Sequence, residues 1–187
     1  MVRSALGPPV PSATGRPLTR LSTCALAAHV LFELVGGVGM PAASVLGPAR
    51  AGAAWATGFA VVWRSAGARS PSAERALALW NGFGVAAVGA HLLAWPTRRT
   101  RAGLPWLCDC EGLGPELMRV YNPILYVSGV AAAAAIVGEN RSASRGLPIL
   151  AMALTPALVV AQRVEHRRLR AIAEQHPAWW NRRLQQR

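Results

Sequence analysis

The sequence predicts an all-α, polytopic transmembrane bundle of four or five spans with an amphipathic C-terminal helix. Two observations lead to this prediction. Apolar residues make up 52% of the 187 residues and charged residues only 15%, whereas a soluble domain carries about 25% charged residues. The charges are also spaced so that long uncharged stretches lie between them, and a spanning helix needs about 20 mostly apolar residues.

The net charge of +12 narrows the choice of partners. All of the basic residues are arginines. They lie between apolar stretches and not on a basic stripe interleaved with aromatic residues, which is what a nucleic-acid-binding surface requires. We therefore expect no nucleic acid, and we expect a bilayer with anionic headgroups as the partner.

The first segment, residues 1–20, is rich in proline and is predicted to be a disordered arm, because it has too little apolar mass to pack. A secretory signal peptide is an alternative, with residues 21–35 as its apolar region and a cleavage zone at Ala42, Ala43 and Ser44. Glu33 inside the apolar region argues against cleavage.

One transmembrane domain is predicted over residues 21–172, with helices near 21–43, 46–66, 75–96, 118–138 and 146–172. The second of these has Arg50 and Arg64 so close together that it crosses only if Arg64 snorkels at one end. If it is re-entrant, the bundle has four spans. The last helix is expected to continue beyond the bilayer as a charged extension.

Arginine distribution sets the expected orientation, since cytoplasmic loops carry an excess of basic residues. With five spans the termini lie on opposite sides, and the arginine-rich C-terminus is expected in the cytoplasm of a bacterial-type plasma membrane. If the second helix is re-entrant, both termini are cytoplasmic.

Ionisable residues inside the spans are the first functional candidates. His29 and Glu33 are four residues apart and therefore share one face of a helix. A charged glutamate at mid-bilayer costs about 3 kcal/mol, so Glu33 is expected to be protonated, paired or facing a cavity. The pair predicts a proton relay, a small-ligand site or a metal site, with His91 as a further member. The structural alternative is a packing hydrogen bond from Glu33 to His91 or Asn81.

Glycines are expected to act on helix packing. Gly36, Gly37 and Gly39, followed by Pro41, either expose carbonyl groups to a cavity or end the first helix. Gly82 and the neighbouring Gly84 predict close packing of helices.

The predicted loop at 97–117 carries Cys108 and Cys110 among three carboxylates, at Asp109, Glu111 and Glu116. Thiolates and carboxylates can chelate a soft or borderline metal ion. However, Cys-x-Cys has no second pair to complete four ligands. The alternative is an interfacial loop, anchored by Trp106, whose acids meet Arg98, Arg99 and Arg101.

A further group of residues opens the fourth span and continues into the last helix: Arg119, Tyr121, Asn122, Pro123, Tyr126, Arg163, Glu165, His166 and Leu169. This pattern partly resembles the C-terminal half of isoprenylcysteine carboxyl methyltransferase-like membrane enzymes. Asn122 stands where that family has a histidine. The resemblance implies a cradle for a methyl donor, with Arg119, Glu165 and His166 as the residues it nominates.

The C-terminal segment, residues 173–187, is predicted to be a basic interfacial tail. Pro177 ends the helix, and Trp179 and Trp180 precede Arg182 and Arg183. Indole rings prefer the headgroup region and guanidinium groups prefer anionic lipid.

Two classes of function remain open. A non-enzymatic protein would bind a small ligand, pass protons or dock a membrane-protein partner at a mid-bilayer pocket around His29, Glu33 and His91. A membrane enzyme acting on a lipid-like substrate would have its pocket at the cytoplasmic boundary, beside Arg119 and Glu165. No nucleotide-binding, hydrolase or zinc-finger motif is present. The sequence indicates no particular cofactor, and it is compatible with a homo-oligomer.

Overall fold

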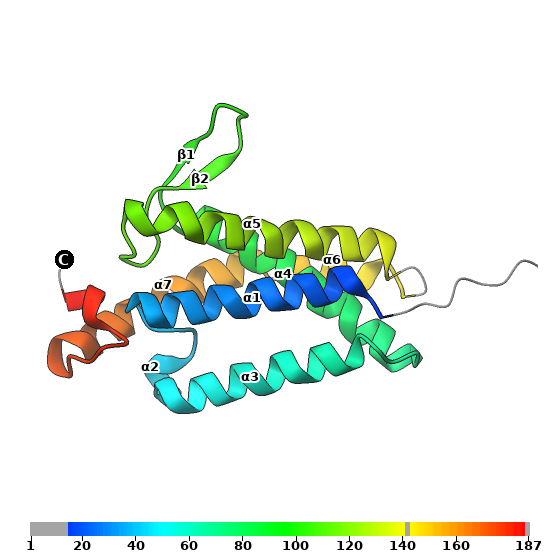
Figure 1. The fold of residues 1–187 in the computed structure, drawn as a ribbon, viewed down its shortest axis with the longest axis horizontal. Coiled ribbons are helices and arrows are strands. Elements are labelled where there is room, and N and C mark those ends of the chain that lie inside the picture. The colour runs from blue at the N-terminus through cyan, green and yellow to red at the C-terminus, as the bar shows by residue number, and fades with distance from the viewer. Residues whose placement is uncertain (1–14, 141–142, 186–187) are drawn as a thin grey trace, which may run out of the picture.

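The computed structural model describes residues 15–140 and 143–185, which form a helical bundle (Figure 1). The all-α bundle predicted from the sequence is confirmed. The helices are α1 (Pro17–Gly36), α2 (Ala43–Leu46), α3 (Pro48–Ser65), α4 (Pro71–Ala94), α5 (Pro115–Gly138), α6 (Gly146–Met152) and α7 (Thr155–Gln175). Two short strands, β1 (Thr97–Arg99) and β2 (Pro105–Leu107), and a 3-10 helix η1 (Arg182–Gln185) complete the elements.

Prolines begin most of the long helices. They stand in the first turn of α1, α3, α4, α5 and α7, where the missing N–H leaves no intrahelical hydrogen bond unmade. Pro17 therefore starts α1 inside the segment that the sequence predicted to be a disordered arm. Residues 1–14 of that arm lie outside the described part of the chain.

Four helical segments are long and apolar enough to cross a membrane: α1, α4, α5, and α6 together with α7. The predicted single helix over 146–172 is interrupted at Ala153 and Leu154. Pro156 follows closely, and it has no N–H to donate to the carbonyl of Met152 four residues earlier, so the helical hydrogen-bond pattern is broken here. The shorter α3, with Arg50 and Arg64 near its ends, is not one of the four.

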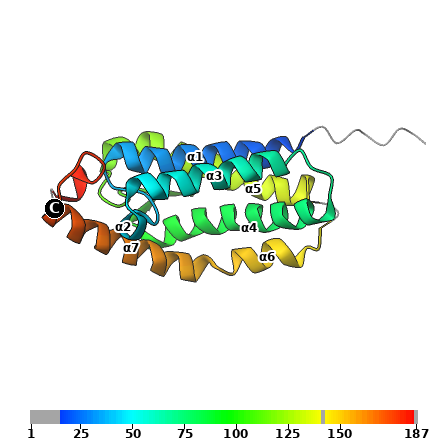
Figure 2. The same cartoon turned by 90° about the horizontal axis from the view of Figure 1, so that it is seen from below.

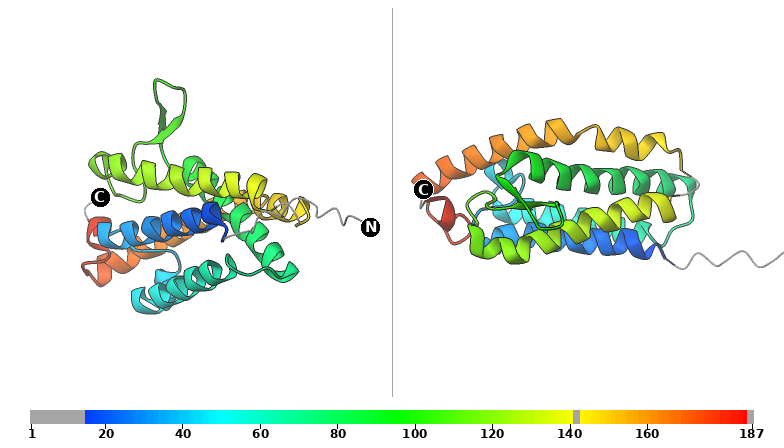
Figure 3. Two further views of the ribbon diagram at one scale, coloured as in Figure 1. Left: turned by 45° about the vertical axis from the view of Figure 1, so that its right-hand side comes forward. Right: turned by 90° about the horizontal axis from the view of Figure 1, so that it is seen from above.

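The bundle is held together by close contacts between small residues. Helix α4 lies between the α1–α5 pair and the α6–α7 segment (Figures 2 and 3). A Cβ added at Gly82 would lie 2.5 Å from the Pro148 carbonyl oxygen of α6, and one at Gly84 would lie 3.2 Å from Ala132 Cβ of α5. The close packing predicted for these two glycines is confirmed.

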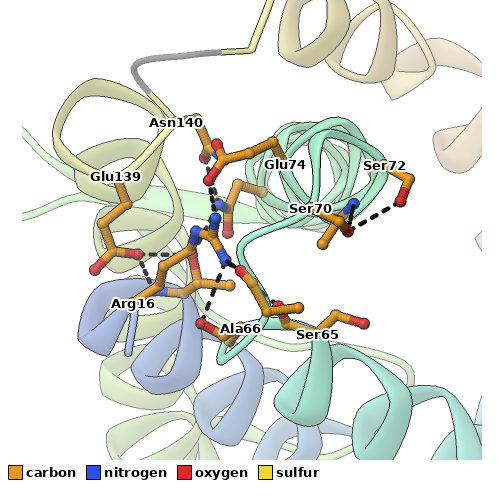
Figure 4. Close-up of polar contacts among 12 residues, drawn as sticks. Arg16, Ser65, Ala66, Ser70, Ser72, Glu74, Glu139 and Asn140 are labelled. Carbon is orange, nitrogen blue, oxygen red and sulfur yellow. Dashed lines mark hydrogen bonds and ion pairs between the residues drawn. The ribbon is translucent and has the colours of Figure 1, made fainter. Parts of the chain in front are cut away.

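Polar contacts around Arg16 tie the helix ends together at one end of the bundle, which we call the Arg16 end (Figure 4). Arg16 forms an ion pair with Glu74 at the start of α4. Glu139, just after α5, accepts hydrogen bonds from the backbone N–H groups of Leu18 (2.6 Å) and Thr19 (2.9 Å) at the start of α1. Helices α1 and α4 therefore begin at the same end and run in the same direction.

The segment predicted to be a loop at 97–117 contains an antiparallel hairpin, in which Arg98 of β1 is paired with Trp106 of β2. The hairpin projects from the side of the bundle (Figure 1). Asn122 of α5 holds its second strand, because its Oδ1 accepts from Leu107 N at 2.9 Å and its Nδ2 donates to Leu107 O at 3.1 Å. Arg99 donates to the Gly103 carbonyl, so this arginine stabilises the hairpin turn.

The described part of the predicted interfacial tail folds back over the end of α1. Arg182 Nη2 donates to Val35 O at 2.7 Å, and Gly39 N donates to Trp180 O at 2.9 Å. Gly37 ends α1 in a left-handed conformation (φ 85°), and a Cβ there would lie 2.8 Å from Arg182 Cγ. Of the two roles considered for the glycine run, the structure has the one that ends the helix, and glycine also lets the tail approach.

Candidate functional site

Three buried polar side chains converge at the end of the bundle opposite the Arg16 end. His29 and Glu33 lie on successive turns of α1, and His91 lies near the end of α4. Glu33 Oε1 is 3.0 Å from His29 Nε2 and 3.5 Å from His91 Nε2. The three residues are 3%, 1% and 7% exposed. The structure thus brings together the pair predicted from the i, i+4 spacing and the histidine predicted to join it.

Tyr121 of α5 completes this cluster. Its hydroxyl donates to Glu33 Oε1 at 2.6 Å and lies 3.2 Å from His29 Nε2. The Cys110 thiol donates to the same hydroxyl at 3.5 Å. Tyr121 was predicted only as part of the opening of a span, because no local pattern separates a membrane-boundary tyrosine from a buried one. Its role depends on the start of α5 lying beside the end of α1.

The Nδ1 atoms of the two imidazoles, which face away from Glu33, have different environments. His91 Nδ1 lies 2.8 Å from the Ala87 carbonyl and 3.1 Å from Gln162 Nε2 of α7. His29 Nδ1 is buried without a hydrogen-bond partner among the described residues. His91 is therefore oriented by its own helix, whereas His29 is oriented mainly by Glu33 and Tyr121.

A cavity of about 220 Å³ adjoins the cluster. Its apolar wall is formed by Leu26, Val30, Met40, Pro41, Ala42, Trp55, Phe83, Ala87, Leu158, Ala161 and Leu169. Its polar lining is formed by His29, Glu33, His91, Glu111, Gln162 and Glu165. Ala161 of α7 is exposed whereas Glu33 is buried, so the cavity extends from the outer surface of the bundle inward to the cluster.

Two more carboxylates face this cavity. Glu165 of α7 accepts from Ser44 N at 2.9 Å and from Ser44 Oγ at 2.5 Å. Glu111, in the segment before α5, is 8% exposed and has a positive φ of 54°. Burial raises the pKa of Glu111 well above its ordinary value, and the carboxylates of Glu33 and Glu165 raise that pKa further. Glu111 therefore keeps its proton to higher pH than an exposed glutamate.

A second cavity, of about 200 Å³, lies beside the first and shares Glu111 with it. It is lined by Trp95, Pro96, Asp109, Glu111, Gly112, His166, Arg170, Arg183 and Leu184. It mixes acidic and basic side chains and lies against the folded-back tail, so it is a polar pocket at the cluster end of the bundle.

The structure separates the other predicted site residues. Asn81 lies towards the Arg16 end, where its Nδ2 donates to Thr19 Oγ1 (3.0 Å) and Asn140 Oδ1 (2.8 Å). The expected alternative partner for Glu33 is therefore elsewhere, since α4 places Asn81 nearly three turns before His91.

The residues nominated by the methyltransferase resemblance are also divided. Arg119 is exposed and lines neither cavity, Glu165 lines the first and His166 the second. A common cradle made from all three is not formed.

The structure places the two cysteine thiols of the loop against different neighbours. Cys108 Sγ lies 3.9 Å from Trp106 O, Cys110 points to Tyr121, and both thiols are free. In the described part of the chain, His29, Glu33 and His91 form the group of three or more His, Cys, Asp or Glu residues whose ligand atoms lie within 4.8 Å of one another. Neither cysteine belongs to it.

The position of the cluster along the helices also differs from the predicted mid-bilayer position. Glu33 and His91 each lie three residues before the end of their helix, so the cluster is near one end of the bundle and not at its middle. Glu165 lines the same cavity. Glu33 and Glu165, which were predicted to belong to two alternative pockets, therefore line one cavity, whereas Arg119 lines neither cavity.

Comparisons with protein-family models, with curated proteins and with solved structures found no match to this chain.

Proposed function

We propose that this multi-pass membrane protein binds a small, mostly apolar molecule in the cavity beside α7, with the polar end of that molecule at His29, Glu33 and His91. One observation carries the proposal: an apolar cavity of about 220 Å³ ends at a cluster of buried ionisable groups. Ligand sites in proteins combine a mainly apolar wall with a few convergent polar groups in this way.

The lining narrows the class of ligand. Its acidic groups are Glu33, Glu165 and Glu111, of which Glu111 keeps its proton to higher pH, and among the described residues no arginine lines the cavity. A ligand with a neutral polar end, such as a hydroxyl group, fits this lining, whereas the carboxylates alone would repel an anionic end. The volume is below the roughly 300 Å³ of typical ligand pockets, so the cavity holds a small molecule or one end of a longer amphiphile.

We further propose a bacterial-type plasma membrane and a cytoplasmic C-terminus. The exposed arginines near the end that carries the cluster are Arg50, Arg98, Arg99, Arg101, Arg119, Arg163, Arg167, Arg168 and Arg182. Those near the Arg16 end are Arg64, Arg69, Arg75 and Arg145. The excess at the cluster end favours the cytoplasmic side for it, where anionic headgroups would be its partners.

Photolabelling tests the ligand proposal. The probe is a diazirine derivative of octanol, applied to the purified protein in lipid nanodiscs, with labelled residues located by mass spectrometry. We expect labels at cavity residues such as Trp55 and Leu158. The Ala161→Trp variant fills the mouth of the cavity and should reduce these labels several-fold.

Ala157→Trp is the matched control, because Ala157 is exposed one turn earlier on the same helix and does not line the cavity. Its labelling should equal that of the wild type. Equal labelling of cavity residues in both tryptophan variants, or labels confined to the outer surface, would contradict the proposal.

A further inference from the structure

We propose that His29, Glu33 and His91 bind one divalent transition-metal ion, of the zinc class, with an open coordination position facing the cavity. This inference deepens the proposed function. It rests on that proposal in one respect, which is that the metal ion would lie at the polar end of the same cavity.

The donor set and its spacing match a metal site. Two imidazole nitrogens and one carboxylate form the three-ligand set found at zinc ions that keep one position open. With metal–ligand bonds of about 2.0–2.1 Å, two ligands of a tetrahedral zinc ion lie about 3.3 Å apart. The Glu33 Oε1 atom is 3.0 Å from His29 Nε2 and 3.5 Å from His91 Nε2. The pairwise distances from the carboxylate are therefore already those of two edges of a coordination tetrahedron.

The charge of the cluster also favours a cation. Glu33 is 1% exposed, and the described partners of its carboxylate are His29, His91 and Tyr121, with no arginine among them. A buried carboxylate is costly unless a positive charge and hydrogen bonds compensate it. A divalent ion between the three side chains supplies that charge.

The surroundings of His91 orient it as a metal ligand. When Nδ1–H is donated to the Ala87 carbonyl at 2.8 Å, Nε2 points at Glu33. In the neutral ring a lone pair of Nε2 then faces a lone pair of the carboxylate unless a proton or a metal ion lies between them. Metal-binding histidines commonly donate their other N–H to a backbone carbonyl in this way. Gln162 Oε1 is buried without a partner, and turning this amide over would let it accept from the same Nδ1–H.

Tyr121 and the cavity supply two further features of a metal site, a group that restrains a ligand and room for a fourth ligand. The Tyr121 hydroxyl donates to Glu33 Oε1 and so restrains the carboxylate, as a second layer of groups does around metal ions. The adjoining cavity provides room for a water molecule or a ligand atom at the fourth position.

The first experiment uses the wild-type protein alone. Protein in detergent is stripped with a chelator, loaded with Zn²⁺ and desalted. We expect one zinc ion per chain by elemental analysis. X-ray absorption should show nitrogen and oxygen neighbours at about 2.0–2.1 Å and imidazole scattering. No retained zinc, or a sulfur neighbour at about 2.3 Å as Cys108 or Cys110 would give, overturns the inference.

Variants then locate the ion. In competition titrations with a chromophoric chelator, His91→Ala and Glu33→Gln should weaken Zn²⁺ binding by more than about 100-fold, and Tyr121→Phe by about 10–100-fold. His166→Ala and Glu139→Gln are matched controls, since they remove a histidine and a carboxylate outside the cluster, and both should bind Zn²⁺ as the wild type does. Unchanged binding in folded His91→Ala and Glu33→Gln overturns the inference. If these two variants do not fold, the X-ray absorption of the wild type decides.

Failure of the metal site and failure of the ligand site are distinguishable. Octanol-probe labelling of cavity residues in zinc-free protein, together with absent zinc binding, overturns the metal site alone. Stoichiometric zinc binding together with labelling that Ala161→Trp does not reduce overturns the ligand proposal alone.

Discussion

At the scale of single residues, one carboxylate oxygen organises the candidate site. Glu33 Oε1 lies within 3.5 Å of His29 Nε2 and His91 Nε2 and receives the Tyr121 hydroxyl. A glutamate inside a bilayer costs about 3 kcal/mol on insertion scales, and each hydrogen bond to a charged group returns about 1.5–3 kcal/mol. The cluster can therefore hold an acid that an apolar bundle would otherwise exclude.

Glu111 gives a pH-dependent prediction at this scale. Its pKa is raised in the folded protein by burial, so in the pH range above the ordinary glutamate pKa the unfolded chain loses this proton before the folded protein does. The unfolded state then binds fewer protons, and stability falls as pH rises. The wild type should lose thermal stability from about pH 5 towards pH 8, and Glu111→Gln should lose less.

The thermal unfolding of detergent-solubilised protein across this pH range is the measurement. Glu116→Gln is the control, because Glu116 is an exposed carboxylate in the same part of the chain. The assignment would be disproved if the melting temperature of Glu111→Gln changed with pH as steeply as that of the wild type. It would also be disproved if the wild type gained stability with rising pH and the variant did not.

At the scale of elements, small residues decide which helices meet. Gly82 of α4 lies against the backbone of α6, and α5 presents the small Ser128, Ala131, Ala132 and Ala135 on its buried face. In a membrane, apolar side chains gain little from leaving lipid, so close backbone approach and van der Waals contact between helices carry more of the packing energy.

Gly82→Ala tests this contact. The added Cβ would lie 2.5 Å from Pro148 O and 2.7 Å from Pro148 Cα, so backbone must move, and we expect a loss of about 1–3 kcal/mol. Gly58→Ala on α3 is the matched control, since no atom of the described residues lies within 4 Å of its added Cβ, and it should gain about 0.5–1 kcal/mol from helix propensity. Thermal unfolding measures both. Changes of the same sign in the two variants would refute the packing argument.

At the scale of the whole molecule, the direction of the helices determines the number of crossings. Helices α1 and α4 both begin at the Arg16 end. If both span the membrane, α3 must return the chain between them and so cross in the opposite direction, although its composition is the least apolar of the long helices before α7. Arg50 and Arg64 near its ends can reach the headgroups by snorkelling. We therefore expect five crossings, with the termini on opposite sides.

Cysteine accessibility tests this topology. In a variant with Cys24, Cys108 and Cys110 replaced, single cysteines at the exposed positions of Val45, Ala68 and Ala102 are labelled with an impermeant thiol reagent on sealed vesicles of known orientation. Val45→Cys and Ala102→Cys should react from one side and Ala68→Cys from the other. Reaction of Val45→Cys and Ala68→Cys from the same side would show that α3 does not cross.

The sequence by itself determined the class of fold, the approximate positions of the long helices and the nearness of His29 to Glu33. These properties are local, since hydropathy and a four-residue spacing act within one helix. It also indicated where close packing at Gly82 would occur.

Only the tertiary structure decided what surrounds Glu33. Tyr121, Glu111 and Glu165 reach the site from three other segments, whereas Asn81 turns to Thr19 and the cysteines remain apart. The rotation and depth of each helix set these contacts. In a chain whose helices are apolar on most faces, periodicity does not specify which face meets which neighbour, so those contacts depend on the packing of the whole bundle.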